Sequence, residues 1–149
     1  MKQRQLRHTP LAAAFALACL TLTASSALYA QAAPIRIGVV TPLTGTYAGI
    51  GQQVKWGIDL AVKEINDKGG IMGRKIEAIY EDEEANPNVA VQKAEKLFQV
   101  SNVDFLTGTV NSGSTLAVGQ LAERNNKLIA TTVSFADSIT GDKCSPNVF

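Results

Sequence analysis

Hydrophobic and polar positions follow two alternating patterns along most of this chain: short apolar runs and longer amphipathic stretches. Ile35 to Thr41 is a β-branched run closed by Pro42, which predicts a buried strand. Residues 52–68 carry apolar side chains at helical spacing and end at Gly69-Gly70, so they predict an amphipathic helix with a glycine stop.

The same alternation continues to the end of the chain. Strands are expected at 75–80, 103–106 and 128–133, helices from Asn86-Pro87 and from 111–114 to about 125, and a fifth strand opening at Val148-Phe149. The buried face of the second helix is expected to consist of Ala90, Ala94, Leu97 and Phe98. Strands and helices joined by short connections predict an α/β fold with a parallel, doubly wound sheet. Such sheets bind ligands outside the carboxyl ends of their strands, so the candidate loops are 42–51, 81–86, 108–114 and 133–139.

The first 32 residues have the layout of a secretory signal peptide rather than of a folded element. The first eight carry three basic residues and no acidic one, residues 11–22 are almost purely apolar, and Ala30-Gln31-Ala32 places small residues before a cut after Ala32. The apolar run is too short to span a bilayer. Two alternatives remain. One is a buried N-terminal helix, although such a helix normally has a polar face and residues 11–22 have almost none; the other is lipoprotein processing at Cys19. The prediction is therefore a leader at 1–32, a ligand-binding region at 33–149 and export to the periplasm.

Composition narrows the class of partner. Hydrophobic residues make up 46% of the chain and charged residues 18%, which excludes a wholly disordered chain. From residue 33 onward there are 11 basic and 13 acidic residues, so there is no basic surface for nucleic acid.

Few residues could carry catalysis. The single histidine, His8, lies in the predicted leader, and Cys144 is the only cysteine after it. Ser-His and Cys-His triads and zinc sites are therefore not expected, and no cofactor is predicted. A lone Cys144 in an exported protein is a free thiol or pairs with a cysteine outside this chain.

Three local motifs bear on ligand chemistry. The acidic run Glu81 to Glu84 could hold a hard cation, but a solvated strand end is the simpler interpretation because neighbouring carboxylates on a strand point to opposite faces. Gly49 to Val54 resembles a dinucleotide-binding loop without its third glycine, which keeps an NAD-linked enzyme as an alternative. Gly108 to Thr115 joins a strand to a helix N-terminus, which favours an anion, whereas Asn111 or Ser112 could instead simply cap that helix.

Taken in order, four segments resemble one family. They are TPLTGTYAGIG (41–51), AVKEINDKGGIMGRKIEAIYED (61–82), Asn86-Pro87 and GTVNSGST (108–115). Together they are similar to the periplasmic leucine/isoleucine/valine-binding protein family, the type I substrate-binding proteins of bacterial ABC importers. The resemblance runs from residue 35 to 149 and implies an incomplete first lobe of a protein whose two lobes close on a ligand. It also implies a partner, the importer permease in the inner membrane.

The resemblance assigns roles to residues position by position. Ser112 stands where relatives hold the substrate carboxylate, and Val110 and Asn111 line the pocket beside it. Val133 stands where a backbone carbonyl meets the ammonium group. Phe135 replaces a small hydroxyl residue at the second ammonium contact, which departs from α-amino-acid recognition.

Ile50 matches an aromatic position that packs on the ligand side chain, and Tyr47 lies close to it. With Phe135, these two residues favour an apolar or aromatic ligand. The predicted function is an exported importer receptor for branched-chain or aromatic amino acids or related carboxylates. A ligand-sensing domain of a signalling receptor uses the same lobe and remains an alternative. Family members are much longer than 149 residues, so the unpaired Cys144 and the strand opening at the end predict an N-terminal fragment.

Overall fold

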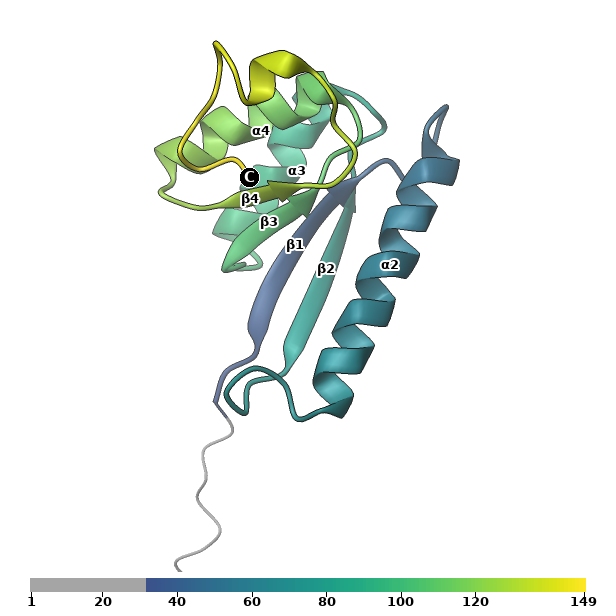
Figure 1. The fold of residues 1–149 in the computed structure, drawn as a ribbon, viewed down its shortest axis with the longest axis vertical. Coiled ribbons are helices and arrows are strands. Elements are labelled where there is room, and N and C mark those ends of the chain that lie inside the picture. The colour runs from purple at the N-terminus through teal and green to yellow at the C-terminus, as the bar shows by residue number, and fades with distance from the viewer. Residues whose placement is uncertain (1–31) are drawn as a thin grey trace, which may run out of the picture. The chain divides into compact units, whose positions relative to one another are not determined.

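The computed structural model describes residues 32–149, so nearly all of the predicted leader lies outside the described residues. The elements are β1 (Ile35–Thr41), α2 (Ala48–Asp67), β2 (Ile76–Asp82), α3 (Pro87–Gln99), β3 (Phe105–Gly108), α4 (Ser112–Arg124), β4 (Ile129–Thr131) and a 3-10 helix, η2 (Asp137–Ile139). The strands form one parallel sheet in the order β2-β1-β3-β4. Figure 1 shows α2 on one face of the sheet and α3 and α4 on the other. The predicted doubly wound α/β fold is confirmed.

The strand order places a switch point beside β1. The chain leaves β1 for β2 on one side and then crosses back to β3 on the other, so β1 lies between them. Val40 near the end of β1 pairs with Glu81 of β2 and with Gly108 of β3. The loops that follow β1 and β3 therefore start next to each other, where open α/β sheets bind ligands.

The main hydrophobic core lies under α3 and α4. Its members are Val40, Ala90, Ala94, Leu97, Phe98, Val103, Leu106, Val118, Leu121, Ala122 and Ile129, all buried. The four positions predicted for the inner face of the second helix are among them. Asn86 caps α3 by accepting hydrogen bonds from the N–H groups of Asn88 and Val89, and Pro87 is its first residue, as predicted.

Helix α2 begins at Ala48, four residues before the predicted start at 52. Gly49 and Gly51, which lie in the candidate loop 42–51, fall inside the first turn of α2. Gly51 packs directly on Pro42, where a Cβ atom on Gly51 would stand 1.8 Å from the Pro42 carbonyl oxygen. The side of α2 that faces the sheet is fastened by the Tyr80 hydroxyl, which donates to Asp59 at 2.6 Å. Lys55 lies 4.3 Å from the centre of the Tyr80 ring and pairs with Asp59.

The strands begin and end at other residues than predicted where the backbone pairing does not follow the apolar run in the sequence. β2 extends to Asp82 because its last two residues still pair with Val40 and Thr41 of β1. β3 begins at Phe105, two residues late, because the buried Val103 donates its N–H to the carbonyl of Leu97 instead of to a strand. β4 covers three residues rather than six.

The chain end runs beside β4, as the predicted fifth strand requires. Val148 forms a parallel bridge with Ile129. The N–H of Thr131 donates to the carbonyl of Phe149 at 2.7 Å, and the N–H of Phe149 donates to Ile129 at 2.9 Å.

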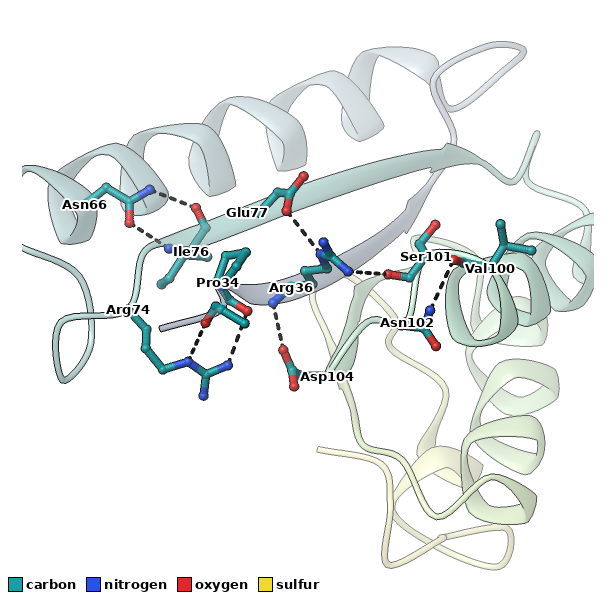
Figure 2. A network of polar contacts seen from close by, with 11 residues as sticks. Pro34, Arg36, Asn66, Arg74, Ile76, Glu77, Val100, Ser101, Asn102 and Asp104 are labelled. Atoms are coloured by element: carbon teal, nitrogen blue, oxygen red, sulfur yellow. Dashed lines mark hydrogen bonds and ion pairs between the residues drawn. The ribbon is translucent and has the colours of Figure 1, made fainter. Parts of the chain in front are cut away.

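A polar network ties the amino end of the sheet together, at the end opposite the candidate loops (Figure 2). The Arg36 guanidinium pairs with the Glu77 carboxylate at 3.2 Å, and the backbone N–H of Arg36 donates to the Asp104 carboxylate at 2.8 Å. Arg74 donates to the carbonyl oxygens of Ala33 and Pro34, at 2.7 and 3.2 Å. Because Arg36 and Glu77 are both about half exposed, their ion pair contributes at most about 1 kcal/mol. In the part of the chain that the structure describes, no helix has the length and apolar character needed to cross a membrane.

Candidate functional site

The N-terminus of α4 is capped from within the chain. The Asn111 side-chain oxygen accepts hydrogen bonds from the N–H groups of Gly113 at 2.7 Å and Ser114 at 3.3 Å. Asn111 is therefore the N-cap, which decides between the two capping residues considered from the sequence. Two of the N–H groups expected to be free for an anion are therefore already used within the chain.

Ser112, the first residue of α4, fastens the helix to the loop after β4. Its hydroxyl oxygen accepts hydrogen bonds from the N–H groups of Phe135 at 3.2 Å and Ala136 at 3.3 Å. A serine oxygen has two lone pairs and one proton. With both lone pairs engaged, the Ser112 hydroxyl can offer an incoming group only its proton, which suits a carboxylate.

The loop after β1 is held in place by Asp82 at the end of β2. One carboxylate oxygen of Asp82 accepts from the N–H groups of Leu43 at 2.8 Å and Glu84 at 2.9 Å, and the other accepts from the Thr44 hydroxyl at 2.6 Å. Partial burial disfavours the ionised form, but these hydrogen bonds outweigh it and lower the pKa of Asp82. Asp82 thus positions the segment that leads to Tyr47 and Ile50.

The acidic run is not the solvated strand end expected from the sequence. Glu81 is 9% exposed, and its carboxylate pairs with Lys93 at 3.1 Å and Lys96 at 2.5 Å of α3. Glu83 is fully buried. Glu81 contacts lysines of α3, and Glu83, which follows β2, contacts the backbone that leads into α4. Within residues 32–149, no three His, Cys, Asp or Glu side chains gather in a metal-binding arrangement.

Glu83 lies against the backbone that leads into α4. One carboxylate oxygen accepts from the Val110 N–H at 3.2 Å, and the other makes no well-formed hydrogen bond. Burial raises the pKa of Glu83, and the nearby Ser114 hydroxyl and the N–H groups of Val110 and Asn111 oppose this shift only in part. The side chain is therefore a buried acid beside the loop that carries Ser112.

Glu83→Gln is expected to remove a pH-dependent loss of stability. Because folding raises the pKa of Glu83, its protonated side chain stabilises the folded protein fully at pH values below its ordinary pKa of 4.5. This stabilisation is lost as the pH rises through the higher pKa of Glu83 in the folded protein. Glutamine keeps the acceptor for Val110 and carries no charge. Thermal or urea unfolding between pH 4 and 8 measures this effect. With rising pH, the free energy of unfolding of the variant should increase relative to that of the wild type, by about 1–3 kcal/mol at pH 8.

Glu84→Gln is the matched control, because the Glu84 side chain is exposed. It should leave the pH profile of unfolding unchanged. A Glu83→Gln profile parallel to that of the wild type over the whole pH range would show that the buried carboxyl does not titrate with folding.

The other predicted site residues occupy the same end of the sheet with different exposure. Phe135 is 85% exposed, Tyr47 41% and Ile50 38%, whereas Val110 and Val133 are half-buried. The structure joins Ser112 directly to Phe135 through a hydrogen bond. No hydrogen bond in the described residues joins Tyr47 or Ile50 to Ser112.

Two other features do not form the site. Gly49 to Val54 lie within the first turns of α2 instead of in a strand-to-helix loop, so they do not form the cradle of a dinucleotide site. A cavity of about 220 Å³ lies between α4 and the segment from Ile139 to Val148, and neither Phe135 nor Ala136 lines it.

Comparison with known proteins identifies the family. The family model described as "Periplasmic binding protein" matches residues 34–149. The chain belongs to the periplasmic binding protein family. It is 39% identical over 121 residues to the Leu/Ile/Val-binding protein BraC3 of Rhizobium johnstonii, a match that covers 80% of this chain and 33% of BraC3. The chain therefore spans about a third of that curated relative.

Solved structures of family members with ligands share the fold. The branched-chain amino acid transporter substrate-binding protein LivJ from Streptococcus pneumoniae, in complex with isoleucine, aligns with a TM-score of 0.73 and 28% identity over 78% of this chain and 33% of that one. A solute-binding protein of an ABC transporter from R. palustris, in complex with benzoate, aligns with a TM-score of 0.71 and 34% identity over 78% of this chain and 32% of that one. These relatives of the chain are transport substrate-binding proteins, not enzymes.

Sequence reasoning missed several residues that shape the site. Asp82 and Glu83 were considered only as part of a possible cation site or a solvated strand end, and Ser134 was not singled out within the candidate loop 133–139. The signal available in the sequence was the density of hydroxyl residues after β4, in the run Thr131-Thr132-Val133-Ser134.

Proposed function

We propose that this chain is the N-terminal part of an exported substrate-binding protein that delivers a small apolar carboxylate to an ABC importer permease in the inner membrane. The ligand class is branched-chain or aromatic amino acids or related aromatic acids. Binding occurs by closure of two lobes, of which the described residues supply the sheet and loops of the first. The family match and the ligand-bound relatives support this proposal.

The observation that carries the proposal is the hydrogen-bond state of Ser112. Because the Phe135 and Ala136 N–H groups occupy its oxygen, its proton is free for one acceptor at the carboxyl end of β3. A hydrogen bond to a charged acceptor is stronger than one between neutral groups. A ligand carboxylate satisfies this requirement, and Ser112 is its anchor.

The apolar part of the ligand is proposed to contact Phe135, Tyr47 and Ile50. Phe135 is 85% exposed, so its ring is free to pack against a bound molecule. A phenyl ring cannot provide the hydroxyl that an ammonium group needs. Benzoate, the ligand of one relative, carries a carboxylate on an apolar ring without an ammonium group. We therefore propose that the protein binds benzoate more tightly than isoleucine.

The test is calorimetry on the complete protein with benzoate and isoleucine as probes. Ser112→Ala should weaken binding of the preferred probe by about 1.5–3 kcal/mol, or roughly 10- to 150-fold, while folding stability changes less. Ser101→Ala is the matched control, because Ser101 lies at the other end of the sheet and uses only backbone groups, its carbonyl to Arg36 and its N–H to Lys96, which alanine keeps. If Ser112→Ala bound the probe with wild-type affinity, Ser112 would only stabilise the loop after β4, and the proposal that it binds the ligand carboxylate would be wrong.

Export gives a separate expectation. Protein recovered from the periplasm should begin at Ala33, because the small residues at 30 and 32 mark the cut. N-terminal mass spectrometry of that fraction checks this directly. A soluble periplasmic species that retains Met1 would exclude cleavage.

A further inference from the structure

Four hydroxyl side chains meet at the carboxyl ends of β3 and β4. Thr109 follows β3, Thr115 lies in the first turn of α4, Thr131 ends β4 and Ser134 lies in the loop after it. The Thr109 hydroxyl oxygen is 2.8 Å from that of Thr115 and 3.2 Å from that of Thr131. The Thr115 hydroxyl also contacts that of Ser134. Thr109 and Thr115 are fully buried, so water does not replace these hydrogen bonds.

The donors of the cluster can be assigned in one consistent direction. The Thr109 hydroxyl donates to that of Thr115 at 2.8 Å, and the Ser134 hydroxyl donates to the Thr109 carbonyl at 3.3 Å. Each hydroxyl has one proton, so Ser134 can only accept from Thr115. Thr115 in α4 thereby holds Ser134 in the β4 loop.

Ser134 in turn positions the two residues after it, Phe135 and Ala136. Their N–H groups are the ones that occupy the Ser112 oxygen. Ser112 and Thr115 lie one turn apart at the start of α4, so the loop is fastened to this helix at two points. Without the Thr115–Ser134 contact, the remaining hydrogen bonds from the loop to α4 would be the two to Ser112, at 3.2 and 3.3 Å.

Backbone strain occurs at the same place. Thr109 has a φ of 60°, in the left-handed region that a β-branched residue rarely adopts. Its N–H donates to the Val40 carbonyl at 2.5 Å, which ties this strained residue to β1. Strain of this kind persists where the surroundings over-determine it, and it gathers at binding sites.

We propose that Thr115 and Ser134 are positioning residues for Ser112: their hydroxyl contact holds the β4 loop so that Ser112 acts only as a donor, and the site then selects a carboxylate over the corresponding carboxamide. This inference rests on the proposed function for its ligand, but not for its geometry. A carboxamide can accept the Ser112 proton only through a neutral oxygen, which is a weaker acceptor than a carboxylate, and its N–H group finds no free lone pair on a fastened Ser112.

The geometry is tested without ligand. Backbone order parameters of Phe135 and Ala136 are measured by NMR in the wild type and in Ser134→Ala, Thr115→Val and Thr115→Ser. They should fall from about 0.85 to below about 0.6 in the first two variants and recover in Thr115→Ser, which keeps the hydroxyl. Ser138→Ala, a serine four residues after Ser134 that lies outside the cluster, is the control. Unchanged order at Phe135 and Ala136 in both Ser134→Ala and Thr115→Val overturns the proposal.

The selectivity is tested by calorimetry with benzoate and benzamide, and with isoleucine and its amide. Ser134→Ala should lower the acid-to-amide affinity ratio at least about fivefold, whereas Ser138→Ala leaves it unchanged. An unchanged ratio in a protein that binds the acid overturns the selectivity role. If the wild type binds neither acid, the proposed ligand class is wrong, and the order parameters still decide the positioning role.

Discussion

Gly108→Ala is expected to lower the free energy of unfolding by about 2–5 kcal/mol, by combining backbone strain with overpacking. Gly108 has a φ of 101°, and a Cβ atom placed on it would stand 2.4 Å from the Val40 carbonyl oxygen. That oxygen cannot withdraw, because Val40 lies in the central strand β1 and pairs with both neighbours. The variant must open the β1–β3 contact or straighten the turn into α4.

Urea unfolding of the wild type and the variant measures this loss. Gly57→Ala is the matched control, because Gly57 lies in α2 with open space around its Cβ position. Alanine there should stabilise the helix by about 0.5–1 kcal/mol. A Gly108→Ala protein as stable as the wild type would mean that the turn after β3 relaxes freely, which would also remove the basis for a rigid Ser112 loop.

Local sequence patterns were sufficient for the order and type of the strands and α-helices from β1 to β4, but not for the 3-10 helix η2. Asn86-Pro87 marked the start of α3, and the spacing from Ala90 to Phe98 marked its buried face, because capping and amphipathic periodicity are short-range properties. The early start of α2 escaped prediction because it depends on the packing of Gly51 on Pro42. The start of β3 escaped prediction for a similar reason. The apolar side chain of Val103 is buried, as in a strand, but its N–H donates to the Leu97 carbonyl in a turn.

The site was only partly predictable for the same reason. Ser112 could be placed at the start of a helix after a strand, where ligands bind, from its position in the pattern alone. Its proposed role as a donor depends on N–H groups 23 and 24 residues further along the chain. Glu83 was expected in solvent because strand alternation says nothing about later segments that pack against a strand end, and the backbone that leads into α4 packs against Glu83. The burial of an acidic side chain thus depends on tertiary packing and cannot be predicted from a run of acidic residues.

A polypeptide of residues 33–149 alone is expected to bind benzoate or isoleucine no more tightly than about 1 mM, or about −4 kcal/mol. The proposed mechanism encloses the ligand between two lobes, and these residues offer it the loops of one sheet. A hydrogen bond from Ser112 that stays open to water contributes little net free energy. Apolar ligand surface that stays wet forfeits about 25 cal/mol for each Å².

The same polypeptide is expected to be poorly soluble or partly molten, because Trp56 and Leu60 lie one turn apart on α2 and are 63% and 59% exposed. NMR titration with both probes, run beside the complete protein as the control, measures the affinity, and urea unfolding measures cooperativity. A soluble polypeptide of residues 33–149 that unfolds cooperatively and binds either probe at micromolar concentration would contradict the two-lobe mechanism, because one lobe would then supply the binding energy that closure is proposed to provide.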